Sequence, residues 1–319
     1  MKLVVQIPCL NEAATLPLVL NSIPKKIKGI DEIEIVIIDD GCTDDTVVVA
    51  KKHGVKHFVH HARPQGLARA FQDGINKSLA LGADIIVNTD GDNQYPQHRI
   101  PDLVTPIVSQ RADMVIADRQ VQTIAHFSPM KKLLQRVGTK VLNLAAGTDI
   151  PDAPSGFRAY SREAAIRINV VTGFSYAMET LIQVANKRLA IESIPVEVNP
   201  KTRESRLFKS SWEHVLKSGI AIARAFAMYR PYVVFGTIGV ALLLLGLIPF
   251  VRFLYFIITD STAGVRHLQS LIAGGVLLSA SFIAFTLGIV ADLIRINRIL
   301  IEQNLEHQKH ARFNREHHQ

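Results

Sequence analysis

Carboxylates and an amide stand directly after one of the apolar runs in the N-terminal part of this 319-residue chain. Asp90 and Asp92 follow the run Asp84–Asn88, and Gln94 adds a neutral oxygen two residues further on. Gly91 lets the chain turn sharply between the two aspartates. Because Mg²⁺ and Mn²⁺ prefer oxygen ligands, we predict that these three side chains hold one such ion and that diphosphate oxygens complete its shell. An ordinary turn rich in aspartate is the alternative.

Two further runs end in polar side chains. Asp39 and Asp40 close the second run, where a carboxylate can accept hydrogen bonds from a base or a ribose. Asn11 and Glu12 follow the first run, behind the bend at Pro8, and carry polar groups toward the same edge. Simple capping of the helices that follow is the alternative for both loops.

Over residues 1–210, short apolar runs alternate with helical patterns, and these predicted strands and helices hold the polar side chains described above. Such alternation predicts a mainly parallel sheet with helices on both faces. Ligands of these sheets bind beyond the carboxyl ends of the strands, so the two acidic loops should face one cleft. The expected strands are Leu3–Ile7, Ile35–Ile38, Lys56–His60 and Asp84–Asn88, and the expected helices are about Thr15–Ser22, Asp45–His53 and Leu67–Leu81.

Two late stretches, Tyr232–Val251 and Leu268–Ile294, are long and apolar enough to cross a hydrocarbon core as helices. Both are hydrophobic all round, although a pair of buried helices in a soluble protein is the alternative. Basic residues are denser outside this hairpin than in its link, so both termini and the N-terminal domain should be cytoplasmic. The expected division is a cytosolic domain at 1–210, an amphipathic helix at 211–230, two membrane spans within 231–295 and a polar cytosolic tail at 296–319.

The net charge of the chain limits the classes of molecule that it can bind. The formal charge of +8 and the pI near 9.5 require an anionic partner, which is a nucleic acid, an acidic membrane or a phosphorylated substrate.

The apolar face of 211–230 suits a helix in the membrane interface or one packed on the soluble domain. Cys9 and Cys42 lie in a predicted buried strand and a loop, which favours a reduced compartment over a disulfide framework. The N-terminal run turns polar after Leu10 and is interpreted as a strand and not a signal peptide.

Six segments, taken in order, resemble the family 2 glycosyltransferases. The resemblance is to the polyprenyl-phosphate branch in particular, which includes dolichyl-phosphate mannose synthase and undecaprenyl-phosphate sugar transferases. It covers about residues 1–210, and the two-span tail resembles that of some members. The segments are IPCLNE, IIDDGCTDDT, GLARAFQDGINKSLALGADIIVNTDGDNQYP, ADR, DAPSGFRAYSR and KTRESRLFKS.

This resemblance implies a GT-A fold and inverting transfer of a sugar from a nucleotide-sugar, GDP-mannose or a UDP-hexose, to a polyprenyl phosphate. The implied nucleotide-sugar ligands are Pro8, Asn11, Glu12, Asp39, Asp40, Ala68 and Asp90. The implied metal ligands are Asp90, Asp92 and Gln94, and the implied catalytic residues are Asp92 and Asp152. The implied contacts to the acceptor phosphate are Arg119, Lys131, Gln135, Arg203 and Arg206.

Some positions depart from the family pattern. Cys9 stands where the family often has tyrosine, and Cys42 where it often has serine. Lys131 and Gln135 replace the arginine and serine common in the mannose synthases, and KTRESRLF lacks a usual glycine. These changes concern nucleotide contacts and the acceptor, and they leave the reaction class intact.

Three alternative functions agree less well with the sequence. A processive polysaccharide synthase needs more spans and a Gln-x-x-Arg-Trp element, which this sequence lacks. A catalytically inactive, membrane-tethered nucleotide-binding protein is disfavoured by the metal-binding pattern. Nucleic-acid binding is disfavoured because the basic residues cluster beside the spans and no aromatic stacking platform is evident. The small residues Gly274, Gly275, Ser279 and Ala280 allow close helix packing, either within the hairpin or in a homo-oligomer.

Overall fold

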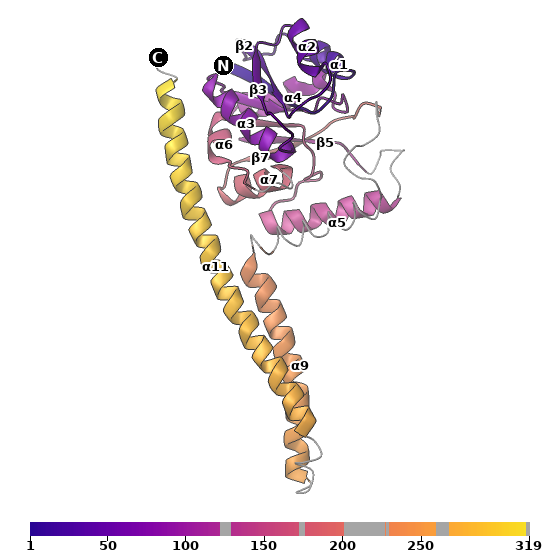
Figure 1. The fold of residues 1–319 in the computed structure, drawn as a ribbon, viewed down its shortest axis with the longest axis vertical. Coiled ribbons are helices and arrows are strands. Elements are labelled where there is room, and N and C mark those ends of the chain that lie inside the picture. Colours follow the sequence, from indigo (N-terminus) through magenta and orange to yellow (C-terminus); the bar gives the residue numbers. More distant parts are fainter. Residues whose placement is uncertain (122–128, 172–175, 201–226, 228–229, 260–267, 317–319) are drawn as a thin grey trace. The chain divides into compact units, whose positions relative to one another are not determined.

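The computed structural model describes residues 1–121, 129–171, 176–200, 227, 230–259 and 268–316 (Figure 1). The chain divides into two compact units. The N-terminal unit contains Met1–Ile222 together with Asn304–Gln319, and the hairpin unit contains Ala223–Gln303. The predicted amphipathic helix at 211–230 lies outside the described residues except for 227 and 230.

The described residues of the N-terminal unit form a seven-stranded sheet in the order β3-β2-β1-β4-β6-β5-β7. Strand β6 runs antiparallel to both of its neighbours, and every other pair is parallel. The prediction of a mainly parallel sheet is therefore confirmed. The strands are β1 Lys2–Cys9, β2 Glu32–Asp39, β3 His57–His60, β4 Ile85–Asn88, β5 Met114–Asp118, β6 Arg158–Ser161 and β7 Ile191–Pro195.

Helices cover both faces of this sheet. Successive side chains of a strand point to opposite faces, and β1 shows the consequence. Leu3 and Ile7 belong to a core cluster with Leu16 and Leu103 of two helices, whereas Gln6 faces the third helix. The helices are α1 Leu16–Ser22, α2 Thr46–Lys52, α3 Leu67–Ala80, η1 Gln97–Arg99, α4 Ile100–Val108, α5 Pro129–Ala146, α6 Arg162–Arg167 and α7 Tyr176–Asn186.

The expected helices and strands of the first 88 residues are confirmed within one to three residues at each end. The helix expected at Leu67–Leu81, for example, is α3 at Leu67–Ala80. Strong periodicity over 14 residues and the turn residues around them define this element from the sequence alone.

The C-terminal turns of the last helix, α11 at Leu268–Glu316, pack within the N-terminal unit. Arg162 donates through Nη2 to the carbonyl of Phe313 at 2.9 Å, and Lys309 donates through Nζ to the carbonyl of Ile168 at 2.8 Å. The Phe313 side chain is buried. The C-terminal segment expected as a polar tail is thus a helix with a buried aromatic anchor.

The hairpin unit consists of α9, Pro231–Thr259, and the first part of α11. Both helices are long and apolar enough to cross a membrane, by length and composition. The two helices run antiparallel (Figure 1). Small residues lie where they touch: Ser281 Oγ donates to the Gly239 carbonyl at 2.8 Å, and a Cβ on Gly274 would lie 3.1 Å from the Gly246 carbonyl oxygen. Gly274 therefore serves the hairpin itself, while a Cβ on Gly275 would meet no atom within 4 Å.

Candidate active site

The sheet register brings the loops after β1, β2 and β4 together. Cys9 pairs with Asp39 at the ends of β1 and β2, and Gln6 pairs with Asn88 at the end of β4. Because these strands are parallel, their carboxyl ends share one edge, and ligands of such sheets bind there. Pro8 is the penultimate residue of β1, at this edge, and is buried.

The loop after β1 contacts the acidic loop after β4 directly. The Thr15 hydroxyl lies 2.7 Å from the Gly91 carbonyl and 3.0 Å from Glu12 Oε2. A Cβ on Gly91 would lie 3.1 Å from Cys9 Sγ and 3.2 Å from Glu12 Cγ. The glycine is required here for space and not for a left-handed turn, which this loop makes at Asn93, with a φ of 59°.

Asp39 presents a nearly buried carboxylate that the protein holds at both oxygens. Oδ1 accepts from the Cys42 amide at 2.7 Å, and Oδ2 lies 3.0 Å from His60 Nδ1. Burial raises the pKa of Asp39, but the hydrogen bonds from His60 and Cys42 outweigh it and leave the pKa below its usual value. Asp39 is therefore an ionised acceptor near neutral pH.

Asp40 points to different partners. Its Oδ1 accepts from the Gln65 amide at 2.8 Å and lies 2.7 Å from His61 Nδ1, and its Oδ2 accepts from the Gly66 amide at 2.9 Å. These bonds fix the turn that leads into α3, whose first turn contains the buried Ala68. Asp40, a predicted nucleotide ligand, thus holds the turn before Ala68, which is another predicted nucleotide ligand.

Asn11 anchors the loop after β2. Its side-chain Oδ1 accepts from the Thr43 backbone amide at 2.8 Å, and its backbone amide donates to Cys42 Sγ at 3.2 Å. Its φ of 57° is the left-handed conformation that asparagine tolerates better than most residues. Asn11 therefore joins the first two loops of this edge.

Asp90, Asp92 and Gln94 lie together on the loop after β4. The Gln94 amide donates to Asp92 Oδ1 at 3.1 Å, and a Cβ on Gly156 would lie 3.6 Å from Asp90 Oδ2. Within the described part of the chain, no group of three or more His, Cys, Asp or Glu side chains could hold a metal ion. Two carboxylates and one amide oxygen nevertheless fit Mg²⁺ or Mn²⁺, which take further oxygens from water or phosphate.

A buried polar network lies beneath this loop. Gln6 Nε2 donates to Asn88 Oδ1 at 2.9 Å, and Asn88 Nδ2 lies 2.9 Å from the Gly156 carbonyl and 3.0 Å from Tyr176 Oη. The Gly156 amide donates to Tyr95 Oη at 2.9 Å. Sequence reasoning missed these positioning residues, although polar Gln6 and Asn88 within apolar strands were a signal.

Arg158 is the largest fully buried side chain in the described part of the chain, and its role is not predicted from the sequence. Its guanidinium is fully buried and donates to the carbonyls of Ser155 at 2.7 Å, Ala177 at 2.8 Å and Ala153 at 2.6 Å, and to Thr180 Oγ1 at 2.9 Å. These four acceptors compensate its burial. Arg158 therefore clamps the 153–156 turn to α7.

The predicted acceptor residues Arg119 and Gln135 meet the predicted catalytic Asp152. Arg119 Nε and Nη2 donate to the two oxygens of Asp152 at 2.7 and 2.9 Å, and Gln135 Nε2 donates to Oδ1 at 3.2 Å. Burial raises the pKa of Asp152, which is 2% exposed, but the charge and hydrogen bonds of Arg119 lower it below its usual value. The side chain of Lys131, and all of Arg203 and Arg206, lie outside the described residues.

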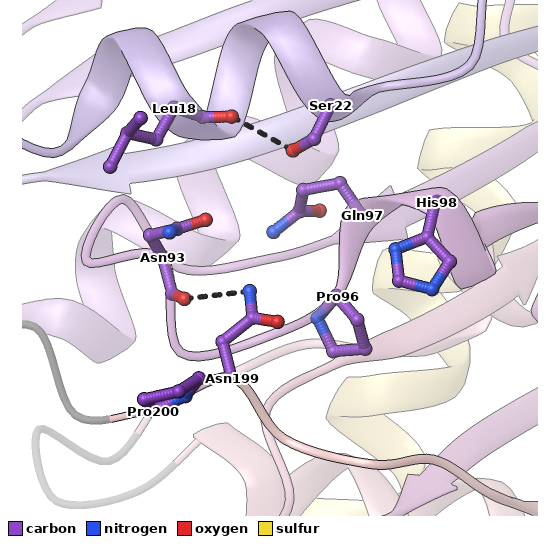
Figure 2. Close-up of a pocket in the computed structure, with 8 residues that line it drawn as sticks. All are labelled: Leu18, Ser22, Asn93, Pro96, Gln97, His98, Asn199 and Pro200. Atoms are coloured by element: carbon purple, nitrogen blue, oxygen red, sulfur yellow. Dashed lines mark hydrogen bonds between the residues drawn. The ribbon is translucent and has the colours of Figure 1, made fainter.

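A cavity of about 450 Å³ lies beside the acidic loop, on the side of α1 (Figure 2). Asn199 donates through Nδ2 to the Asn93 carbonyl at 3.0 Å at its rim. None of the predicted site residues lines this cavity. Its lining residues are Leu18, Ser22, Asn93, Pro96, Gln97, His98, Asn199 and Pro200.

Two proteins similar to this chain are named for polyprenyl lipids. The undecaprenyl-phosphate mannosyltransferase of Micrococcus luteus is 24% identical over 212 residues, which cover 64% of this chain and 85% of that protein. The polyprenol monophosphomannose synthase of Mycolicibacterium smegmatis is 23% identical over 228 residues, covering 68% and 84%.

Solved structures share the fold. Glucosyl-3-phosphoglycerate synthase from Mycobacterium tuberculosis, in complex with Mn²⁺, UDP-glucose and phosphoglyceric acid, superposes with a TM-score of 0.55 at 26% identity, covering 70% of this chain and 79% of that one. The same enzyme with Mg²⁺ and UDP gives 0.51 at 23%, covering 69% and 79%.

The family model of Glycosyl transferase family 2 matches residues 4–168, which contain most of β1, all of β2 to β6 and every loop of the strand-end site. The fold and the acidic loops agree with that match. The chain is a glycosyltransferase and belongs to family 2.

Proposed function

We propose that this protein transfers a sugar from GDP-mannose or a UDP-hexose to a polyprenyl phosphate at the cytosolic face of a membrane. The observation that carries the proposal is the meeting of three loops, after β1, β2 and β4, at one edge of the sheet with Asp39, Asp90 and Asp92. The names of the relatives support the lipid acceptor. Two helices apolar enough to cross a membrane support the location.

In this proposal the donor binds at the strand ends. Asp39 accepts a hydrogen bond from the base, and Glu12 and Ala68 line the pocket. Asp40 acts through the loop that it holds. Asp90, Asp92 and Gln94 hold Mg²⁺ or Mn²⁺, which when bound stabilises negative charge on the departing nucleoside diphosphate.

The acceptor side relies on cations. Arg119 and Gln135, with Lys131, Arg203 and Arg206, hold the lipid phosphate. A phosphate oxygen is already anionic near neutral pH, so it needs little help from a general base. It attacks the anomeric carbon as the bond to the nucleoside diphosphate breaks, and a single displacement inverts the configuration. Asp152 stands beside the sugar and orients Arg119.

The test is transfer of radiolabelled sugar by the detergent-purified full chain, from a panel of UDP- and GDP-sugars with Mn²⁺ or Mg²⁺. Polyprenyl phosphate and phosphoglyceric acid are offered as separate acceptors, beside an Asp92→Ala variant and a chelator control. We expect labelled, solvent-extractable lipid that disappears in both controls.

Other outcomes contradict the proposal in distinct ways. Label only in the water-soluble product would replace the lipid with a soluble acceptor. Metal-dependent nucleotide binding with no transfer to either acceptor would favour an inactive nucleotide-binding relative.

A further inference from the structure

Two successive histidines at the end of β3 meet two successive aspartates at the end of β2. Asp39 and His60 are register partners on neighbouring parallel strands, and His61 faces Asp40. Each histidine contacts one of the two carboxylates: His60 Nδ1 lies 3.0 Å from Asp39, and His61 Nδ1 lies 2.7 Å from Asp40. The two pairs therefore have separate surroundings and separate consequences.

The His61 pair is internal. The His61 side chain is 6% exposed, and its Nδ1 and Nε2 lie 2.7 Å from Asp40 Oδ1 and 3.2 Å from Asp73 Oδ2. Arg69 Nε donates to the same Asp73 oxygen at 2.7 Å. This chain of contacts ties the turn before α3 to the helix itself, which is a structural task.

The His60 pair lies at the rim of the strand-end site. The His60 side chain is 54% exposed, and its ring stacks on Phe58 with centroids 5.6 Å apart and planes 8° apart. An ionised carboxylate can only accept, so His60 donates from Nδ1 to Asp39 Oδ2. The Cys42 amide donates to the other oxygen, and the carboxylate is held from both sides.

The protein donors to the Asp39 carboxylate are the His60 ring, the Cys42 amide and the Cys42 thiol. Because each carboxylate oxygen accepts more than one hydrogen bond, acceptor capacity remains in a fixed direction. A base with a ring N–H, such as uracil or guanine, matches that capacity. Cytosine and adenine present an acceptor nitrogen at the corresponding edge, and two acceptors facing each other repel.

We propose that His60 is a positioning residue that sets the donor affinity and the nucleobase preference of this enzyme by orienting Asp39. The inference rests on the proposed function only in taking this edge as the nucleotide site, and it does not depend on the acceptor. Loss of the His60 ring lets the Asp39 carboxylate rotate, so that affinity and discrimination between bases fall together.

The test measures binding of UDP, GDP, CDP and ADP to the full chain with Mn²⁺ by titration calorimetry, together with KM and kcat for the donor. Three variants are compared: His60→Ala, His60→Asn, whose amide offers an N–H near the place of Nδ1, and His57→Ala. His57 is the matched control, because it pairs with Glu34 at 3.2 Å at the opposite end of β3.

We expect His60→Ala to raise Kd for the preferred nucleotide, and KM for its sugar, by about 10-fold, since a hydrogen bond to a charged group is lost. The kcat should change less than about 2-fold. Discrimination against CDP and ADP should shrink, His60→Asn should recover most of the affinity, and His57→Ala should bind like the wild type.

The inference is overturned if His60→Ala binds nucleotides like the wild type, if only kcat falls, or if His57→Ala shows the same loss. Absence of UDP and GDP binding in the wild type also overturns it. Wild-type binding without transfer to polyprenyl phosphate defeats the proposed acceptor and leaves the role of His60 intact. Equal thermal midpoints show that a loss of affinity is not a loss of fold.

Discussion

Asp39, which the proposed function assigns to the donor, and Asp152, which it assigns to the acceptor end, have different surroundings. Asp39 is held by an imidazole and a backbone amide, and among the described residues no guanidinium or ammonium pairs with its carboxylate. Asp152 is almost completely buried, with both oxygens on Arg119 and a further bond from Gln135.

The same residue type therefore has two different tasks. In the proposed function, the ionised Asp39 accepts hydrogen bonds from a ligand, whereas both oxygens of Asp152 are paired with Arg119. We infer that the donor end recognises its ligand through a carboxylate and that the acceptor end uses a carboxylate to hold a cation in place.

The largest expected effect is on stability at the acceptor end. Arg119→Met should lower the free energy of unfolding by about 3–5 kcal/mol, because it leaves the buried Asp152 charge without its partner. The measurement is chemical denaturation of the purified chain, and Asp152→Leu in the same background should recover part of the loss.

Arg111→Met is the matched control, since Arg111 makes an exposed pair with Glu192 at 3.6 Å. Exposed pairs contribute about 0–1 kcal/mol. Equal effects of the two methionine variants would show that Asp152 does not depend on Arg119.

The same pair predicts a pH dependence. The folded-state pKa of Asp152 is lowered, so the unfolded chain binds more protons once the pH falls below the unfolded value of about 3.9. The stabilisation by the pair is fully present above that pH and is lost as the pH falls through the folded pKa. The difference in denaturation midpoint between the wild type and an Arg119→Met, Asp152→Leu double variant should therefore change below about pH 4 and stay constant above it. A constant difference at all pH values would exclude an ionised Asp152.

A smaller effect is expected at the donor end. Thr15→Val removes the hydroxyl that joins the loop after β1 to the Gly91 carbonyl, and a neutral hydrogen bond contributes about 1 kcal/mol. We expect KM for the donor to rise by about 3- to 5-fold with little change in kcat. Thr105→Val is the control, because Thr105 lies on the exposed face of α4 and its hydroxyl donates to the Pro101 carbonyl of the same helix. A fall in kcat alone would remove Thr15 from donor positioning.

The sequence predicts the elements around Asp39, Asp90 and Asp92 because period and turn residues are local signals. It also predicts that their loops share an edge, since parallel strands align their carboxyl ends. It does not predict the partners of Asp40, which are two backbone amides and the His61 ring, about 21 to 26 residues away. The Arg158 clamp was missed for the same reason, because its acceptors on α7 become neighbours only in the folded sheet.

The histidines show where a local signal existed and was not used. The pairs Asp39–Asp40 and His60–His61 are visible in the sequence, and both end predicted strands. Their contact requires the register of β2 with β3, which periodicity alone does not supply.

The central claim is that the strand-end site binds a nucleotide through Asp39, and the most direct test is calorimetric titration of UDP and GDP with Mn²⁺ into the full chain and its Asp39→Asn variant. We predict that the variant binds the preferred nucleotide about 10- to 100-fold more weakly at an unchanged thermal midpoint, because the amide replaces a charged acceptor. Asp102→Asn, at an exposed position of α4, should bind like the wild type. Binding by Asp39→Asn that equals the wild type would contradict the account.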